Sequence, residues 1–211
     1  MLVIFDWDGT LLNSLAKISQ CMQLAAVDAG LEPRSEPEIH GIIGLGIPQA
    51  LATLYPDAPD PPLDTLRERY SHHFQIKDQQ PCELYPGVQD TLDQLKSDGH
   101  HIAVATGKSR RGLERVLGNL GWEGYFHATR CADETSSKPD PLMLSELLDE
   151  LEYGVADAVM VGDTEFDLAM AAKLDMRRVG VSYGAHSHER LRLHDPEAII
   201  DRMTELLNFI R

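Results

Sequence analysis

The stretch that decides the fold is Leu2-Val3-Ile4-Phe5-Asp6-Trp7-Asp8-Gly9-Thr10, near the start of the chain. Its four consecutive apolar residues indicate a strand that is buried on both faces, as in a parallel sheet. Two acidic residues follow directly, and Gly9 allows the backbone to turn after them. Because open α/β sheets bind their ligands beyond the carboxyl ends of the strands, Asp6 and Asp8 are candidate site residues.

The same pattern, a short apolar run followed by a helical segment, returns in the second half of the chain. Apolar runs predict strands at residues 102–105, 126–129, 158–161 and 179–181, and helical spacing predicts helices at residues 88–96, 110–117, 142–151 and 168–174. This alternation predicts an α/β fold with a Rossmann-like parallel sheet whose crossovers are right-handed.

A block of helical sequence interrupts this pattern after the first strand. Helical spacing of apolar residues covers 14–30, 39–54 and 63–74, with a proline-rich connection at 56–62 and no strand-like run. Ser14 is a candidate N-cap for the first of these helices. We therefore predict a core domain of residues 1–13 and 84–211, and an inserted all-helical domain of residues 14–83 above the carboxyl edge of the sheet.

The composition restricts the kinds of molecule that this protein is expected to bind. The 211 residues include 19 Lys and Arg against 34 Asp and Glu, so the formal charge is −15, which argues against nucleic-acid binding. The apolar runs fall far short of the roughly 20 residues that span a membrane, and the first has no basic segment before it, so we expect a cytoplasmic protein without a membrane partner. Cys21, Cys82 and Cys131 are too widely spaced to suggest a disulfide framework or a zinc site.

Polar residues also follow the later strands of the predicted sheet. They are Thr106 with Gly107, Lys138, and Asp163 with Asp167. The carboxyl ends of parallel strands meet at one edge, so we expect these residues to lie near Asp6 and Asp8. The Asp6 carboxylate can attack phosphorus and form an acyl phosphate. Asp8 can then protonate the leaving alcohol and later deprotonate the attacking water.

Four carboxylates at one edge would repel one another unless a cation joined them. Mg²⁺ prefers hard oxygen ligands and usually takes one or two carboxylates together with phosphate oxygens and water. We therefore predict a Mg²⁺ site with Asp6 and Asp163 as direct ligands, the backbone carbonyl of Asp8 as a third, and Asp167 holding a bound water. The metal would also screen the charge of the substrate from the Asp6 carboxylate.

The other polar residues suit a phosphate group. Thr106 and the amide of Gly107 lie where a strand opens into a helix, a position that favours phosphate oxygens. Lys138, between Ser137 and Pro139, offers a positive charge to the transferring group, and Lys108 is a second basic candidate. Each element alone also fits a plain turn, a helix start or an exposed lysine. A calcium-binding loop is excluded, because no further oxygen ligands follow Asp6 and Asp8 at alternate positions. Together, each behind its own strand, they predict a catalytic site.

Four stretches resemble the four motifs of the haloacid dehalogenase (HAD) superfamily. They are Ile4–Leu11, Ala105–Lys108, Ser137–Pro141 and Val161–Asp167. The inserted helices resemble the C1 cap of the phosphoglycolate phosphatase-like group, and Ile43–Pro48 is similar to the loop that this cap turns toward the active site. The resemblance implies a HAD core of the Rossmann-like type, Mg²⁺ dependence and the residue roles given above.

The predicted function is that of a Mg²⁺-dependent phosphatase, a phosphoric monoester hydrolase that acts on a small phosphate ester, phosphoglycolate-like or a phosphosugar, through an aspartyl phosphate. Asn13 stands where the group commonly has Asp, and Trp7 is bulkier than the usual residue, so both are expected to affect substrate fit near the hinge of the cap. No arginine stands beside Gly44–Pro48 to bind a substrate carboxylate, and His40 is the nearest polar candidate.

Three alternatives stay open at the level of sequence. A phosphosugar mutase would use the same aspartyl phosphate but exclude water by cap closure. An inorganic pyrophosphatase would keep the same residues with a different leaving group. A non-catalytic binding module could also share this fold. Dehalogenation is disfavoured, because it does not use the acid/base group that Asp8 supplies.

Overall fold

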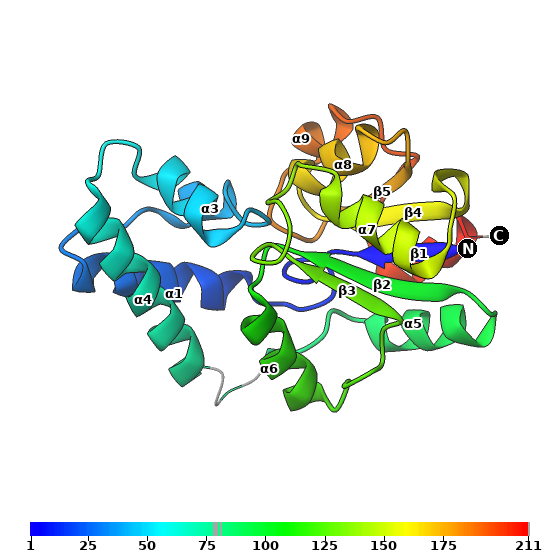
Figure 1. Cartoon of the computed structure of the whole chain (residues 1–211), viewed down its shortest axis with the longest axis horizontal. Helices are drawn as coiled ribbons and strands as arrows, with labels where there is room; N and C mark the ends of the chain where they lie inside the picture. Colours follow the sequence, from blue (N-terminus) through cyan, green and yellow to red (C-terminus); the bar gives the residue numbers. More distant parts are fainter. Residues whose placement is uncertain (78–79, 81, 211) are drawn as a thin grey trace.

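The computed structural model describes residues 1–77, 80 and 82–210. These residues form a six-stranded parallel sheet flanked by helices, with a group of four further helices at one end of the molecule (Figure 1). The predicted α/β class with a parallel sheet is confirmed. Residues 78, 79 and 81 of the predicted helical domain, and residue 211 of the predicted core, lie outside the described residues.

The first strand of the chain lies in the middle of the sheet. The strands are β1 (Leu2–Phe5), β2 (His101–Thr106), β3 (Ala128–Cys131), β4 (Ala158–Gly162), β5 (Arg177–Val181) and β6 (Ala198–Ile200). They pair in the order β3-β2-β1-β4-β5-β6, and every pair is parallel. The chain runs outward from β1 to β3 on one side and then from β4 to β6 on the other. The order therefore reverses between β1 and β4, which is where such sheets bind ligands.

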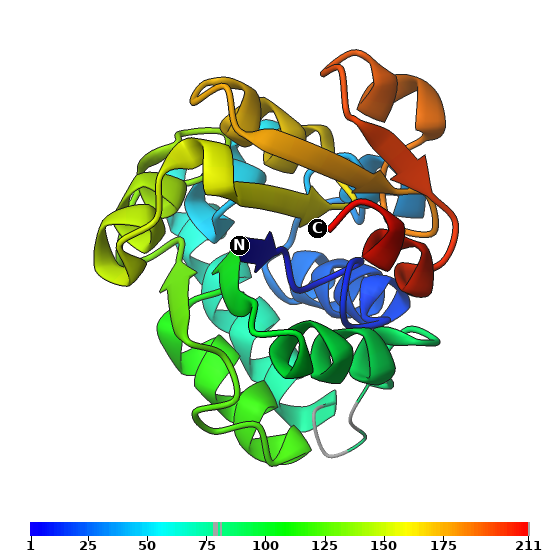
Figure 2. The ribbon, with the colours of Figure 1, turned by 90° about the vertical axis from the view of Figure 1, so that its right-hand side faces the viewer.

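Helices cover both faces of the sheet, as the two perpendicular views show (Figures 1 and 2). One face carries α5 (Val88–Ser97), α6 (Arg110–Leu120) and the short η2 (Met203–Asn208), and the other carries α7 (Leu142–Leu151) and α8 (Glu165–Ala172), with α9 (His188–Arg192) beside α8 and η1 (Val155–Asp157) before β4. Alternate residues of β1 divide between the two layers: Val3 and Phe5 pack into one apolar cluster, and Leu2 and Ile4 into the other. Burial of both faces explains why the strand reads as a continuous apolar run.

The four remaining helices form what we call the helical block: α1 (Leu15–Asp28), α2 (Glu36–His40), α3 (Ile47–Leu54) and α4 (Asp60–Lys77). The block has its own apolar cluster, in which Met22, Leu51 and Leu66 are fully or almost fully buried. No strand is found in its described residues. Neither these helices nor any other in the described chain is both long and apolar enough to cross a membrane.

Several predicted boundaries were wrong. The helix-like stretch predicted at residues 39–54, with interruptions at Gly41, Gly44, Gly46 and Pro48, contains the end of α2 and all of α3, and α2 starts before it, at Glu36. Helix α4 starts at Asp60 rather than at residue 63, since prolines in a first turn need no backbone donor. Strand β3 begins at Ala128, two residues later than predicted, and Phe126 before it packs edge-on against Trp7 with ring centroids 6.0 Å apart. The elements β6, α9 and η2 were not predicted.

Candidate active site

The loop after β1 carries the first two candidate residues. The backbone N–H of Asp6 still donates to the Val161 carbonyl at 2.9 Å, so Asp6 continues the line of the strand. Gly9 then takes a φ of +84°, and a Cβ at this position would collide with the Asp163 carboxylate. Only glycine allows so close an approach between the two acidic loops.

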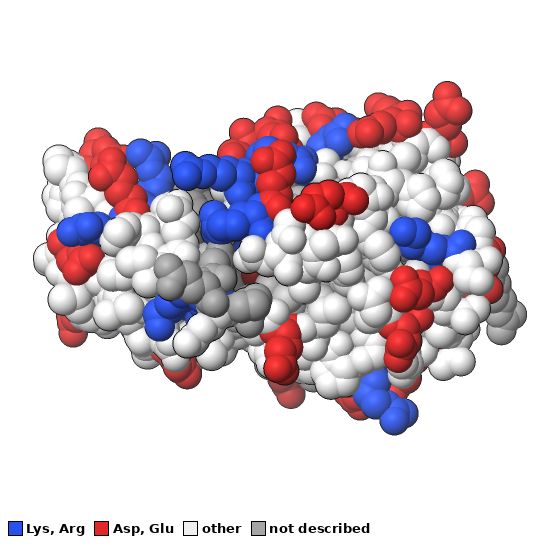
Figure 3. Space-filling view, turned by 90° about the horizontal axis from the view of Figure 1, so that it is seen from below, with Lys and Arg blue, Asp and Glu red and all other residues white. Residues whose placement is uncertain are grey.

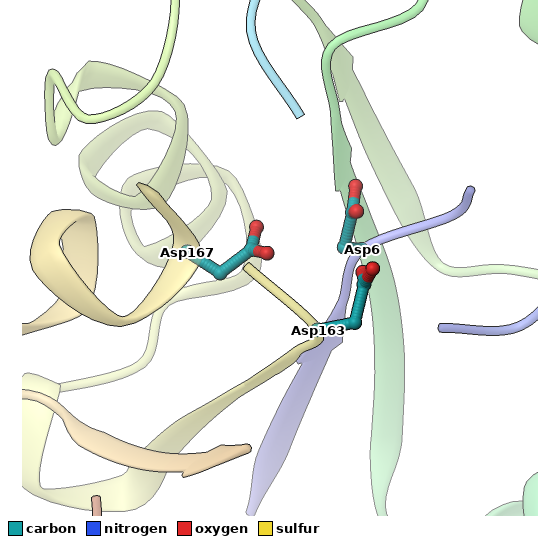
Figure 4. A group of neighbouring side chains, drawn as sticks. All are labelled: Asp6, Asp163 and Asp167. Carbon is teal, nitrogen blue, oxygen red and sulfur yellow. The ribbon is translucent and has the colours of Figure 1, made fainter. Parts of the chain in front are cut away.

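Three aspartates converge at the switch point of the sheet (Figure 4). Asp6 follows β1, Asp163 follows β4, and Asp167 lies in the first turn of α8. All three are buried, and each offers a carboxylate oxygen within 4.8 Å of the others. The predicted convergence of Asp6, Asp163 and Asp167 is therefore what the fold produces.

Lys138 balances part of this negative charge. Its Nζ donates to Oδ1 of Asp6 and to Oδ1 of Asp167, both at 2.6 Å, and its side chain is fully buried. Burial alone would lower the pKa of Lys138, but the ion pairs with Asp167 and Asp6 outweigh burial and hold the pKa above its ordinary value. The lysine is a fixed cation within the cluster. Its partners among the described residues are the two aspartates, and its contact with a phosphoryl group stays a prediction.

One cation cannot offset three buried carboxylates. Burial, opposed by Lys138 and reinforced by Asp167 and Asp163, raises the pKa of Asp6 well above its ordinary value. Burial and the neighbouring Asp167 raise the pKa of Asp163 to about 7. Without a further cation, the cluster therefore holds protons at pH values where exposed aspartates are ionised.

Hydrogen bonds fix the orientation of the two later aspartates. Thr10 Oγ1 and the Ala185 N–H each donate to Asp163 at 2.8 Å. The N–H and hydroxyl of Thr164 donate to Oδ2 of Asp167 at 3.1 and 2.7 Å, which forms a capping box at the start of α8. The link from Thr10 to Asp163 joins residues 153 positions apart, so local sequence did not indicate it.

The chemistry of the cluster fits a divalent cation. Oδ2 of Asp6 is buried and has no hydrogen-bond partner among the described residues. An unpaired carboxylate oxygen in such a place is costly unless a cation meets it. The available ligand atoms are hard carboxylate oxygens. Lys138 neutralises only one of the three carboxylates, so the cluster stays negative, which suits Mg²⁺.

Asp8 has different partners from the other acids. Its Oδ1 accepts from the Ser14 hydroxyl at 2.6 Å, and its Oδ2 pairs with Lys108 Nζ at 2.9 Å. Lys108 also lies over the ring of Phe74 in the helical block, 4.6 Å from its centroid. Ser14 was predicted to cap α1, but it makes no side-chain cap hydrogen bond and holds Asp8 instead. Ser14 and Lys108 are thus the residues of this site that sequence reasoning underrated.

A pocket of about 190 Å³ opens between the helical block and the edge of the sheet. Asp6, Asp8, Thr106 and Gly107 line it from the side of the sheet. Its apolar wall comes from the helical block, through residues Ile18, Met22, Ile42, Ile43, Leu45, Ile47, Ala50 and Phe74. Lys138, Asp163 and Asp167 lie outside this lining, behind Asp6.

The loop between α2 and α3 rests directly on the phosphate-binding candidates. A Cβ on Gly107 would lie 2.6 Å from the Gly44 carbonyl oxygen and 2.7 Å from that of Leu45. The Gly46 N–H donates to the Ser137 hydroxyl at 2.8 Å, next to Lys138. The loop at residues 43–48, which was expected to face the active site, therefore contacts residues beside the acidic cluster.

Three other residues singled out in the sequence lie away from the pocket. Trp7 is fully buried and packs edge-on against Trp122 with ring centroids 6.1 Å apart, so it belongs to the core rather than to the substrate wall. Asn13 has an exposed side chain, and its backbone N–H donates to the Glu83 carbonyl at 2.9 Å where the chain leaves and re-enters the sheet domain. His40 is not part of the lining.

The sequence is similar to one family model and to proteins that are named as phosphatases. Residues 3–181 match the family model described as haloacid dehalogenase-like hydrolase. The chain is 31% identical over 210 residues to the probable phosphatase IndB of Dickeya dadantii, covering 98% of this chain and 91% of that protein. It is 30% identical over 210 residues to a phosphoglycolate phosphatase of Agrobacterium fabrum, covering 97% and 90%.

The fold is similar to solved structures as well. The crystal structure of a predicted phosphoglycolate phosphatase from Haemophilus somnus superposes with a TM-score of 0.89. The match covers 99% of this chain and 96% of that chain at 24% sequence identity. At this level of identity the similarity concerns the architecture of sheet and helical block.

Proposed function

The chain belongs to the haloacid dehalogenase-like hydrolases and is a phosphatase of that family, and we propose that it hydrolyses a small phosphate monoester through a phosphorylated Asp6 with Mg²⁺ as cofactor. The substrate class is phosphoglycolate-like or a phosphosugar. A cytoplasmic location remains a prediction from the sequence.

The proposal is supported mainly by the contacts of the two oxygens of the Asp6 carboxylate. Lys138 binds its Oδ1, while its Oδ2 has no hydrogen-bond partner among the described residues. The same residue lines the pocket together with Thr106 and Gly107. The carboxylate is thus anchored through one oxygen and has no partner among the described residues on the other, which supports Asp6 as the residue that meets the cation and attacks phosphorus.

In the first step, Asp6 attacks the phosphorus of the bound ester. A bond forms between the carboxylate oxygen and phosphorus, and the bond from phosphorus to the alcohol oxygen breaks. Asp8, in its protonated form, gives its proton to the departing alcohol oxygen. Thr106 and the Gly107 amide hold the phosphoryl oxygens, and Lys138 keeps Asp6 in position for attack.

In the second step, Asp8 takes a proton from a water molecule that attacks the phosphorus. The acyl phosphate bond breaks, inorganic phosphate forms and the Asp6 carboxylate is regenerated. The Lys108 Nζ lies 2.9 Å from Oδ2 of Asp8 and helps to hold this carboxyl group in place. Ser14 keeps the same carboxylate pointed into the pocket.

Asp6, Asp163, the Asp8 carbonyl and, through water, Asp167 would hold the metal. When bound, Mg²⁺ supplies charge neutralisation for the phosphoryl oxygens and for the carboxylates around them. The raised pKa values of Asp6 and Asp163 are consistent with this assignment, since Lys138 alone does not offset the charge of three buried carboxylates.

The helical block, with boundaries 14–83, is proposed to be a cap domain inserted into a core of residues 1–13 and 84–211. The contact of its loop at Gly44 and Leu45 with Gly107 supports this role. In this position the block shelters the acyl phosphate and selects the alcohol part of the substrate.

Hydrolysis of p-nitrophenyl phosphate and of a panel of phosphoglycolate, phosphosugars, nucleotides and pyrophosphate tests the proposal. We expect activity that EDTA abolishes, that Mg²⁺ restores and that Asp6→Asn removes. Release of inorganic phosphate, rather than transfer to a second sugar hydroxyl, separates a phosphatase from a mutase. Activity that persists in Asp6→Asn would contradict the proposal.

A further inference from the structure

The mouth of the pocket is basic, although the chain as a whole is strongly acidic. Besides the residues already described, Arg111 and Arg115 of α6 line the pocket. They are spaced i and i+4, so they lie on the same face of the helix. Arg111 is exposed and Arg115 is half-buried, which places them toward the opening, whereas Asp6 at the inner end is buried.

The neighbouring Arg110 differs from Arg111 and Arg115, because it does not line this pocket. Arg110 donates to Glu134 at 2.8 Å and to the Thr129 hydroxyl at 2.7 Å, so it is held on the outer side of α6. No ion pair with a described residue is found for Arg111. In a protein of formal charge −15, an arginine that faces a ligand pocket and has no acidic partner in the described chain retains its charge for a ligand.

The pocket also has an apolar wall. Its residues Ile42, Ile43 and Met22 are almost fully buried. Figure 3 shows basic side chains gathered at the junction between the helical block and the core, on a surface where acidic side chains are widespread. The pocket therefore combines the phosphate-binding candidates, an apolar wall and two arginines in one lining.

We propose that Arg111 and Arg115 form a second anion-binding subsite, so that the substrate is a phosphate monoester whose alcohol part has an apolar middle and a terminal carboxylate or phosphate. The inference rests on the proposed function, because the phosphoryl group must lie at Asp6. Guanidinium groups bind both anions through paired hydrogen bonds. The recognition that the helical-block loop lacks would thus come from a helix of the core.

Binding of non-hydrolysable phosphonates separates this inference from catalysis. Isothermal titration calorimetry with Mg²⁺ compares 5-phosphonopentanoate, its uncharged amide and pentane-1,5-bisphosphonate. The wild-type protein is expected to bind at least one of the two anion-terminated probes roughly tenfold or more tightly than the amide. Whichever anion binds more tightly identifies the terminal group.

Variants assign the preference to the two arginines. In Arg111→Gln/Arg115→Gln, the ratio of anion to amide affinity is expected to fall toward one. Arg67→Gln is the control, because Arg67 is an exposed arginine of α4 that pairs with Asp64 at 3.2 Å and does not line the pocket. It removes one positive charge, as each single variant Arg111→Gln or Arg115→Gln does, and it is expected to keep the wild-type ratio because the pocket lining is unchanged.

Two results would overturn the inference: a wild-type protein that binds neither anion more tightly than the amide, or a double variant that keeps the preference. Hydrolysis of the matching phosphate esters is measured alongside. If the probes bind with the expected ratio but no ester is hydrolysed, the proposed function fails while the second subsite stands.

Discussion

Asp8 differs from the other site acids because it is held by Ser14 and Lys108 rather than by the acidic cluster. If Asp8 is the general acid, Asp8→Asn should affect the first turnover of alkyl phosphates far more than that of p-nitrophenyl phosphate. General acid catalysis contributes about 10²–10⁴-fold, and p-nitrophenolate leaves without protonation. Rapid-quench measurement of the first turnover at neutral pH tests this. Equal loss for both esters would count against the role of Asp8.

Lys138 is the residue whose removal should most affect the folded protein without metal. Lys138→Met leaves Asp6 and Asp167 buried without their common partner. Loss of one partner from a buried ion pair costs about 3–5 kcal/mol, so the free energy of unfolding in EDTA at neutral pH should fall by that order. Urea unfolding measures the change. Lys173→Met, at an exposed position, is the matched control, and a similar small effect of both substitutions would contradict the account.

The sequence indicated the site residues by their place after strands, and this worked for Asp6, Asp163 and Asp167 because strand ends must converge in a parallel sheet. It worked less well for Ser14, Thr10 and Lys108. Their partners lie across loops or in a different motif, and a hydroxyl beside a helix fits a cap equally well in sequence. Contacts between distant loops depend on the exact turn, which a residue pattern does not specify.

Among the elements, the contact between the α2–α3 loop and Gly107 joins the helical block to the turn that is proposed to bind phosphate. Gly107→Ala should push the Gly44 and Leu45 carbonyls away from the turn. A displacement of about 1 Å can cost about 10²-fold in rate, so kcat/KM should fall by one to two orders of magnitude while the fold is retained. Steady-state kinetics together with thermal unfolding measure both effects.

Gly118→Ala provides the control for this substitution. Gly118 lies within α6, and an added Cβ there meets only Glu123 at an ordinary 3.5 Å. Replacement of a helical glycine by alanine should leave activity unchanged and raise the free energy of unfolding by up to about 1 kcal/mol. If Gly107→Ala were as active as Gly118→Ala, the loop contact would have no role in catalysis.

Long segments with a clear apolar pattern could be predicted from the sequence, whereas very short helices and strands could not. Strands β1, β2 and β4 are buried on both faces and read as continuous apolar runs. Strand β6 has three residues and pairs only with β5, so its short apolar run resembles any loop segment. The five-residue α9 is likewise too short to show a helical period.

At the scale of the whole molecule, the buried acids make stability depend on pH and metal together. The pKa of Asp163 is about 7 in the folded protein against an ordinary value of 3.8, with burial as the main cause. Between these values the folded state binds more protons than the unfolded state, so stability falls as pH rises. Asp6 shifts in the same direction.

We therefore expect the protein in EDTA to lose stability as pH rises from about 4 to about 7 through these groups. Mg²⁺ binds the ionised carboxylates, so the difference in Tm between Mg²⁺ and EDTA should grow over the same range. Thermal unfolding at several pH values with and without metal measures this. Asp163→Asn should flatten the EDTA profile. A Mg²⁺ effect that is largest at acid pH would contradict the assignment.

Asp6 is the proposed acceptor of the phosphoryl group, and chemical trapping tests this directly. The protein is mixed with p-nitrophenyl phosphate and Mg²⁺, quenched within one turnover and reduced with borohydride, which converts an aspartyl phosphate to homoserine. Mass spectrometry of the N-terminal peptide should find homoserine in place of Asp6, and only when substrate is present. Reduction at Asp8 or at any other residue, or none at all while p-nitrophenol is released, would contradict the account.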